Sequence, residues 1–380
     1  MVTARPIAEA FTRPLCDPST PLSALFDRPT VPSVLEILRA DAELPSIGRT
    51  RFSGTLSQRN ALWRDYRNYL RQAISNYQAA LGVDNRSASL LYYYAMLNFA
   101  KAELLSVTPS AVRGRVSHGL SFDPTRAKTV RGDSLIVQNG VFRMLYQHRT
   151  GYQLPVGTQL PIRRLLARIP EIEQQLTSIG MGPVAVCGVL FLLATDGSAS
   201  WSMLGLENDQ HVGPTTASGR LFARLFSRVD APPEWQRHFS MSRRYGPWPA
   251  FYESRATFPH SGVGTPSADV ATLAAHANAW SARDILETAT TGTFDAWLSP
   301  SLFRTTMLPM PPSLARYAVT YYASSLVRYR PSMFDPQISP QYAYLFDALA
   351  RECAVPMLTD TLLALTKRLR FFMPDGAFRT

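Results

Sequence analysis

The stretch ASLLYYYAMLNFAKAELL, residues 88–105, is apolar nearly all the way round when it is drawn as a helix. A helix with this pattern is buried inside a protein rather than lying on its surface. Asn98 and Lys101 interrupt the pattern one turn apart. Burying an amide and an ammonium group costs several kcal/mol unless each finds a partner. The segment therefore predicts a central helix that carries either an internal polar network or a binding site.

A second long helix precedes this segment. From Thr55 onward, apolar residues recur at spacings of three, four and seven, and Gly82 supplies a stop; this is the pattern of an amphipathic helix. The central helix runs from about 87 to 107, where Thr108-Pro109 ends it. We expect the two helices to pack on each other and on a third helix at 312–329. We also expect the tyrosines of the central helix, Tyr94 included, to be buried.

Several segments, read in order, resemble the YaaC-like proteins, a bacterial family. They are SQRNALWRDYRNYLRQAISNYQAA at 57–80, LLYYYAMLNFAKAELL at 90–105, HGLSF at 118–122, GVFRML at 140–145 and YYASSLVRYRPSMF at 321–334. The resemblance implies an intracellular, mainly helical protein, and it assigns no reaction, cofactor or ligand.

The chain is predicted to be α+β and mainly α, with a helical core from both chain ends and an inserted β-rich lobe. We expect an extended N-terminal arm with one short helix at 1–54, a helical half at 55–125, an inserted α+β lobe at 126–262 and a C-terminal helical half at 263–380.

Within the lobe, short β-branched or aromatic runs predict strands, among them GVFRMLY at 140–146, and Asp196-Gly197 predicts a tight turn between two strands. Helices are predicted at 160–176, 215–229, 268–288, 312–329, 339–353 and 355–371.

Composition indicates a folded cytoplasmic protein. The 380 residues are 46% hydrophobic, which is ample for a large core. The longest apolar run, 184–194, is too short to cross a bilayer, and the N-terminus has no apolar signal segment. Three widely spaced cysteines favour neither a disulfide framework nor a zinc site. No membrane association, metal or cofactor is expected.

The net charge of +11 admits two interpretations. Clustered basic side chains neutralise phosphates in nucleic-acid-binding proteins. However, the chain has 36 arginines and only three lysines, a skew that a coding bias would also produce. The basic residues are uneven, because Arg113, Arg115, Arg126 and Lys128 crowd a connector around His118.

Arg113 and His118 are the candidate catalytic residues. Their Arg-x4-His spacing resembles the active-site motif of HEPN-type ribonucleases, in which the His acts as acid or base and the Arg stabilises the transition state. With so many arginines, such spacings also arise by chance. The alternative is a structural role for His118 at the end of a helix or loop.

A second candidate site lies on the predicted helix at 312–329. Tyr317, Tyr321, Ser324 and Arg328 share one stripe that opens before Pro331, so an anion could be held there by Arg328 and Arg330. In the alternative, Arg328 pairs with a carboxylate such as Glu103 or Asp347.

Nucleotide-binding loops of the P-loop and dinucleotide types, zinc-protease motifs and the hydrolase Ser motif are all absent from the sequence. Glu207, Asp209 and His211 are better explained as a polar loop than as a metal site.

Three functions stay open. The first is a binding or regulatory protein whose residues Asn98, Lys101, His118, Ser324, Arg328 and Arg330 receive an anionic ligand, either a nucleotide or a nucleic-acid phosphate. The second is a metal-independent ribonuclease that uses Arg113 and His118. The third is a subunit of a larger assembly, for example in phage defence, that binds a protein partner. We predict that Asn98, Lys101, His118 and Arg328 line one polar pocket, because buried polar groups need partners.

Overall fold

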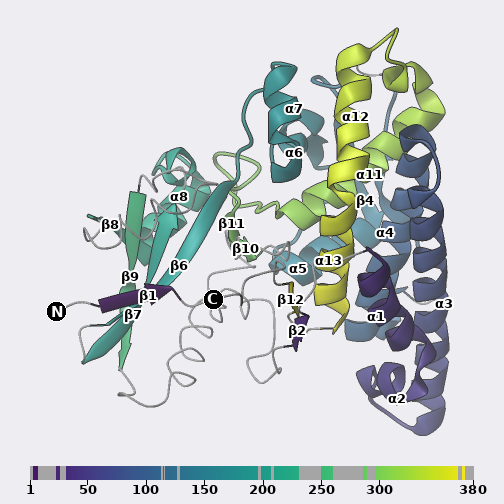
Figure 1. The fold of residues 1–380 in the computed structure, drawn as a ribbon, viewed down its shortest axis with the longest axis horizontal. Coiled ribbons are helices and arrows are strands. Elements are labelled where there is room, and N and C mark those ends of the chain that lie inside the picture. The colour runs from purple at the N-terminus through teal and green to yellow at the C-terminus, as the bar shows by residue number, and fades with distance from the viewer. Residues whose placement is uncertain are drawn as a thin grey trace, which may run out of the picture. The chain divides into compact units, whose positions relative to one another are not determined.

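The computed structural model describes residues 3–6, 23–25, 31–112, 114, 116–125, 129–195, 198–206, 209–230, 250–259, 286–288, 296–366 and 370–372. The chain divides into two compact units (Figure 1). The helical unit comprises Leu25–Val184, Ser313–Thr366 and Phe372–Thr380, and the sheet unit comprises Met1–Ala24, Ala185–Pro312 and Lys367–Phe371. The protein is therefore α+β and mainly α, with a helical core drawn from both sides of an inserted β-rich part of the sequence.

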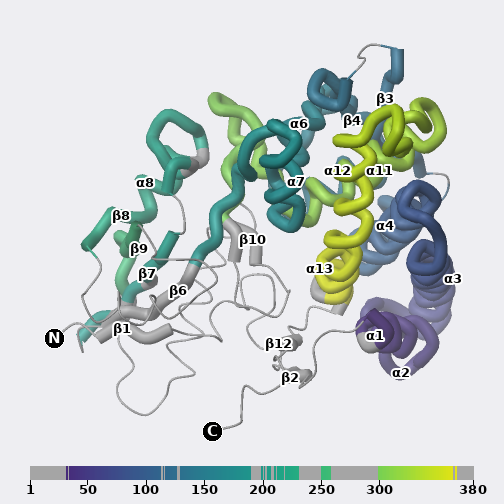
Figure 2. Tube along the Cα trace, turned by 45° about the horizontal axis from the view of Figure 1, so that its top comes forward, coloured from purple at the N-terminus to yellow at the C-terminus, as the bar shows by residue number. Residues whose placement is uncertain are grey.

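Two long helices dominate the helical unit. α3 spans Leu56–Leu81 and α4 spans Asn85–Val107, and they lie side by side (Figures 1 and 2). Thr55 and Gln58 form a reciprocal capping box at the start of α3, and the Asp84 carboxylate accepts a hydrogen bond from an amide in the first turn of α4. Such caps satisfy amide groups that lack a partner in the first helical turn.

The other elements of this unit pack around that pair. Its further helices are α1 (Val31–Glu43), α2 (Pro45–Gly48), α5 (Val141–Thr150), α6 (Ile162–Leu166), α7 (Glu173–Ser178), α11 (Pro312–Tyr329), α12 (Pro340–Glu352) and α13 (Ala354–Thr366). Short 3-10 turns lie at Arg49–Arg51, Pro109–Val112, Pro170–Ile172 and Pro331–Phe334. A three-stranded antiparallel sheet has the order β3 (His118–Phe122), β4 (Ser134–Gly140) and β5 (Gln159–Pro161).

The tyrosines of α4 do not all face the interior. Tyr92 and Tyr93 are 4% and 3% exposed, whereas Tyr94 is 40% exposed. The expectation that Tyr94 is buried is therefore wrong. Three consecutive residues cover about 200° of a helix. The rings of Tyr77 on α3 and Tyr321 on α11 cover Tyr92 and Tyr93, respectively, and Tyr94 lies beyond the arc that they cover.

α11 is enclosed by the rest of the helical unit, and every residue from Pro312 to Leu326 is buried. Two of its serine hydroxyls find acceptors inside the helix, because Ser324 and Ser325 donate to the Tyr321 carbonyl at 2.7 and 3.0 Å. A hydroxyl bonded in this way can be buried without leaving a donor unsatisfied.

A buried ion triad joins α11 to two other segments. Arg316 is 2% exposed. Its Nε and Nη2 atoms donate to the Glu171 carboxylate at 3.2 and 2.8 Å, and Nη1 donates to Asp360 on α13. A buried guanidinium is tolerated only when its donors are satisfied, so these contacts fix the rotation of α11 about its axis.

The sheet unit is built on antiparallel pairings. Its strand order is β10 (Leu286–Thr288), β11 (Ala296–Leu298), β6 (Cys187–Thr195), β7 (Ala199–Leu206), β9 (Ala250–Pro259) and β8 (Phe226–Val229), and β1 (Thr3–Pro6) also pairs with β6. β11 pairs with the start of β6 and β1 with its end. The helix α8 (Ala217–Leu225) contributes Phe222 to the core of this unit. A separate two-stranded sheet pairs β2 (Ser23–Leu25) with β12 (Arg370–Phe372).

The unit boundaries differ from the predicted ones. The segment expected as an N-terminal arm contains the one short helix predicted there, α1, and also α2, and residues 129–184, expected in the inserted lobe, belong to the helical unit. The reason is the packing of the three-stranded sheet on α11, where the rings of Phe122 and Tyr322 meet edge to face and the Tyr322 hydroxyl donates to Asp133. The insertion runs from Ala185 to Pro312 instead of 126–262.

Short segments account for most of the local errors. Residues 141–150 form α5 rather than the predicted strand, because the buried side chains Val141, Phe142, Leu145 and Tyr146 fall at a helical spacing. The helix predicted at 160–176 is divided into α6, a 3-10 turn that begins at Pro170, and α7.

Two predicted helices are shorter than expected, since α8 gives way to β8 at Phe226 and α13 ends at Thr366. Residues 286–288 form β10, and the rest of the helix predicted at 268–288 lies outside the described residues, as does the turn at Asp196-Gly197.

Among the described residues, no helix has the length and apolarity to span a membrane, and no group of three or more His, Cys, Asp and Glu side chains is placed to hold a metal ion. Cys187 and Cys353 are buried, and Cys16 lies outside the described residues.

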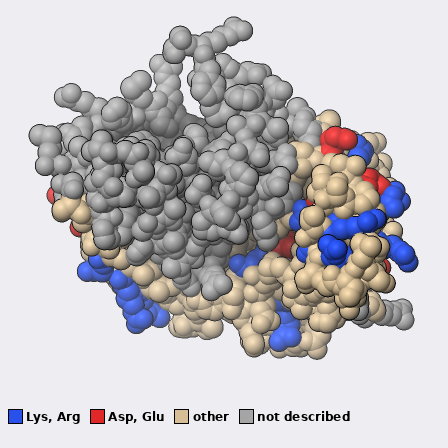
Figure 3. Space-filling view, turned by 90° about the horizontal axis from the view of Figure 1, so that it is seen from below, with Lys and Arg blue, Asp and Glu red and all other residues tan. Residues whose placement is uncertain are grey.

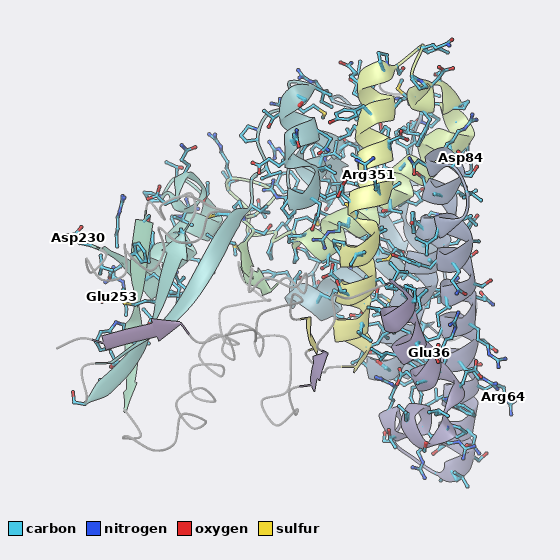
Figure 4. The ribbon with its side chains drawn as sticks, in the orientation of Figure 1. Glu36, Arg64, Asp84, Asp230, Glu253 and Arg351 are labelled. Atoms are coloured by element: carbon cyan, nitrogen blue, oxygen red, sulfur yellow. The ribbon has the colours of Figure 1, made fainter. Side chains whose placement is uncertain are left out.

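The ion triad gives a stability prediction. Arg316→Met should lower the free energy of unfolding by about 3–5 kcal/mol, because it leaves two buried carboxylates without their cation. Arg351→Met is the matched control, since Arg351 is an exposed residue of α12 (Figure 4) whose ion pair within the described part of the chain is with its neighbour Glu352, and it should change stability by about 0.5 kcal/mol or less. Urea unfolding followed by circular dichroism measures both. Equal losses in the two variants would show that the triad does not hold α11.

Candidate functional site

His118 and Arg328 come together although 210 positions separate them in the sequence. His118 lies on β3 and Arg328 in the last turn of α11. The His118 ring lies against Tyr321, with centroids 5.2 Å apart, and meets Tyr93 of α4 edge to face at 6.5 Å. The Arg328 charge acts on His118 and on both tyrosines. Three elements thus build one aromatic and basic cluster, which we call the His118–Arg328 site.

A glycine pair sets the position of His118. His118 is opposite Gly140 in the β3–β4 ladder, and the register shifts between His118 and Leu120. Gly119 has a φ of +85°, and a Cβ there would lie 2.9 Å from the Phe142 amide nitrogen. A Cβ on Gly140 would lie 2.3 Å from the Ser117 carbonyl oxygen. A side chain at either position would therefore force the two strands apart.

The protonation of His118 follows from its surroundings. Partial burial against the tyrosines lowers its pKa from 6.5, and the positive charge of Arg328 lowers it further. The ring is therefore neutral at pH 7. The Leu120 amide points at Nδ1 at 3.4 Å, so Nδ1 is the acceptor and Nε2 carries the proton. The imidazole is left with one N–H donor that a ligand could use.

Arg328 is an exposed arginine without a carboxylate partner among the described residues. Its Nε donates to the Ser324 carbonyl at 3.3 Å, and its guanidinium carbon lies 5.4 Å from the centroid of the Tyr329 ring. Glu103, one of the two acids weighed as its partner, instead binds Arg149 through two hydrogen bonds of 3.0 and 2.7 Å. The terminal nitrogens of Arg328 remain available to an anion.

Asn98 and Lys101 are not part of this cluster. The Asn98 amide donates to the Tyr94 carbonyl at 3.0 Å within α4. Lys101 lies on the side of α4 that faces α3, where its Nζ is 5.6 Å from the centroid of the Tyr69 ring, and burial lowers its pKa. The structure therefore does not place these two residues in a pocket shared with His118 and Arg328.

Ser324 and Arg330 are engaged inside the fold. The Ser324 hydroxyl is fully buried and donates to the helix backbone. Arg330 binds both carboxylate oxygens of Asp133, at 2.8 and 3.2 Å, and the Pro124 carbonyl at 3.1 Å. We therefore do not include Ser324 or Arg330 in the proposed site.

The candidate catalytic pair cannot be assembled from the described residues, because Arg113 lies outside them, as do Arg115, Arg126 and Lys128. His118 itself lies in a strand rather than at the end of a helix. The loop residues Glu207 and His211 that were weighed as metal ligands are not described at the side-chain level either.

Two tyrosine hydroxyls of the cluster lack partners. The hydroxyls of Tyr93 and Tyr317 are buried and make no hydrogen bond within the described part of the chain. Burial raises the pKa of both phenols, so they stay protonated and can donate. Sequence reasoning assigned Tyr93 to the core. The signal for a polar role was its place in the run of three tyrosines beside a predicted site helix.

One cavity of the helical unit lies elsewhere. It is lined by Arg86 at the start of α4 and by Pro331, Ser332, Phe334, Asp335, Pro336, Gln337 and Ile338. Neither His118 nor Arg328 lines it.

The model of the YaaC-like protein family matches residues 56–349. The chain belongs to the YaaC-like family. The YaaC-like match begins with α3, ends within α12 and includes Tyr93, His118, Tyr321 and Arg328. Searches among curated proteins and among solved structures found no match.

The pKa of His118 is a direct test of this geometry. NMR titration of the imidazole should give a value below 6.5, and Arg328→Gln should raise it because one neighbouring positive charge is removed. Arg351→Gln removes the same charge at an exposed position of α12 and should leave the value unchanged.

The pH dependence of the protein's stability tests the same lowered pKa of His118. Because the pKa of His118 is lower in the folded state, the unfolded state binds more protons below about pH 6.5, so stability should fall as the pH drops through this value. That loss should be smaller in His118→Gln. A His118 pKa at or above 6.5 would contradict the arrangement described here.

Proposed function

We propose that this YaaC-like protein is a binding protein for a nucleotide, which it receives at the His118–Arg328 site. The observation that carries the proposal is the state of Arg328, an exposed guanidinium beside an aromatic cluster with no carboxylate partner among the described residues. A group of this kind favours a bound phosphate, because its terminal nitrogens match two phosphate oxygens.

Several other arginines of the helical unit differ from Arg328, because each has a carboxylate partner. A carboxylate of the same unit accepts hydrogen bonds from each of four arginines, Arg51, Arg149, Arg316 and Arg330. Arg328 has the Ser324 carbonyl and a ring face instead. Unlike these four, the exposed Arg328 has no carboxylate partner among the described residues, which supports an external anion.

The rings around Arg328 suit the flat part of a nucleotide. Tyr94 and Tyr329 are 40% and 57% exposed, Tyr94 beside Tyr93 and Tyr329 beside the Arg328 guanidinium, and the His118 ring contacts Tyr93 and Tyr321. Stacking of a base on an exposed aromatic ring contributes about 1–3 kcal/mol. The His118 Nε2–H group supplies one further donor at the same place.

No observation favours the other two functions. A ribonuclease would need Arg113 beside His118, and Arg113 lies outside the described residues. A role as a subunit of an assembly, in phage defence or elsewhere, would appear as a protein partner whose binding is unaffected by Arg328→Gln. A regulatory role would follow from nucleotide binding rather than replace it.

Isothermal titration calorimetry with adenosine monophosphate, adenosine and inorganic phosphate tests the proposal. Adenosine monophosphate should bind most tightly, because it joins a ring and a phosphate in one molecule. Arg328→Gln should weaken its binding about 10- to 100-fold, since hydrogen bonds to a charged group contribute about 1.5–3 kcal/mol. Arg351→Gln should have no effect.

Two results would reject nucleotide binding at this site. One is the absence of binding by wild type, and the other is an equal effect of Arg328→Gln and Arg351→Gln. Incubation with labelled RNA tests the ribonuclease alternative. Cleavage by wild type that is lost in His118→Ala would replace this proposal with the ribonuclease function.

A further inference from the structure

The start of α3 carries a second basic surface, which is independent of the His118–Arg328 site. Leu56, Arg59, Trp63 and Arg67 fall within one side of α3, and the 3-10 turn at Arg49–Arg51 packs against that side. We call the set Arg49, Arg59, Asn60, Trp63, Arg64 and Arg67 the Trp63 face. Its centre lies about 20 Å along the axis of α3 from the level of Tyr93, because Tyr92 of α4 meets Tyr77 of α3 and each helical residue rises about 1.5 Å.

Trp63 is held rigidly and is covered by cations. The guanidinium carbons of Arg49 and Arg67 lie 5.2 and 5.5 Å from the centroid of the indole ring. α2 sits directly on the indole, because a Cβ on Gly48 would lie 2.4 Å from the Trp63 Nε1 atom. Two guanidinium groups are therefore positioned on one ring before any ligand arrives.

The same face gathers polar atoms without partners. Ten buried side-chain nitrogen and oxygen atoms of the described residues make no recorded hydrogen bond, and four of them belong to this face: Arg49 Nε, Arg59 Nε, Asn60 Oδ1 and Trp63 Nε1. Three of the four are donors. These atoms are buried, so they mark a shortage of acceptors beneath this face rather than groups that a ligand contacts.

The charges of this face are unbalanced. Arg49, Arg59 and Arg64 form no ion pair in the described part of the chain, and Arg64 points away from the helical unit (Figure 4). Arg67 and Arg71 share one carboxylate, that of Glu43, and their hydrogen bonds lower the pKa of Glu43 to about 2. Figure 3 shows Lys and Arg side chains, with some Asp and Glu among them, on the described surface at the right of the view.

We propose that the Trp63 face binds the phosphate backbone of a nucleic-acid strand. The arginines from 59 to 71 follow one side of α3 over about 18 Å, so they form a linear array that matches a linear polyanion. The indole is already covered by guanidinium groups, so bases do not stack on it, and recognition is of phosphates and independent of sequence. An acidic polypeptide is the competing occupant, and the experiment separates the two.

The test is fluorescence polarisation with a labelled single-stranded oligouridine of about 12 nucleotides, titrated at several salt concentrations. The double variant Arg49→Gln, Arg59→Gln should bind about tenfold more weakly, and the slope of log affinity against log salt should become shallower by about 0.7 for each arginine removed. Its matched control is the double variant Arg39→Gln, Arg351→Gln, which removes the same charge from two exposed ion pairs of the helical unit and should keep the wild-type slope.

For a second pair of variants, the proposal predicts tighter binding of the oligouridine. Glu43→Gln should tighten binding of the oligouridine several-fold, because Arg67 and Arg71 lose the carboxylate that occupies them. Glu36→Gln removes an exposed acid that pairs only with Arg39, so it should change binding less. Circular dichroism shows whether each variant keeps the helical content of wild type.

Three outcomes would overturn the proposal: no binding of oligouridine at low salt, equal losses in the two double variants, or tighter binding of poly-glutamate that depends on Arg49 and Arg59. The double variant Arg49→Gln, Arg59→Gln is also titrated with adenosine monophosphate. It should keep the wild-type affinity for this mononucleotide, so a failure of nucleotide binding at the His118–Arg328 site stays distinguishable from a failure at this one.

Discussion

The helical unit depends on a guanidinium buried in its interior. Arg316 lies on a helix that is enclosed on all sides, and its donors reach Glu171 before α7 and Asp360 on α13. The intact set contributes little net stability to the fold. Removing one partner lowers the free energy of unfolding by several kcal/mol, because an uncompensated charge is left in a medium of low dielectric constant. The contacts therefore act as a constraint on geometry, since α11 can adopt only the rotation that satisfies them.

That rotation determines what α11 presents to its neighbours. With Arg316 directed at the two acids, Tyr317 and Tyr321 meet Tyr93 of α4, and Arg328 reaches the exposed end of the same side. The bulge at Gly119 brings His118 to this position from the three-stranded sheet. Stability and the proposed site are thus linked, because Arg316 and the site residues Tyr321 and Arg328 lie on one helix.

The sequence was sufficient for the long helices and for part of the site. α3, α4 and α11 follow from the spacing of their apolar residues, and the stripe that ends at Arg328 follows from helical geometry. The wrong predictions concern residues whose contact partners are distant in the chain. Nothing near Lys101 indicates that it faces Tyr69 of α3, nor does the sequence around Arg330 indicate that Asp133 binds it. Residues 141–150 were too short an apolar run to tell a helix from a strand.

The arginines of this protein divide into those with an internal acid and those without one, and the central claim is that Arg328 belongs to the second group because it binds a ligand. A crystal structure of the protein with adenosine monophosphate tests this claim most directly. We predict phosphate density within hydrogen-bond distance of the terminal nitrogens of Arg328, with His118 Nε2 directed at the ligand. Density confined to another surface, or an Arg328 guanidinium paired with a carboxylate of the protein, would contradict it.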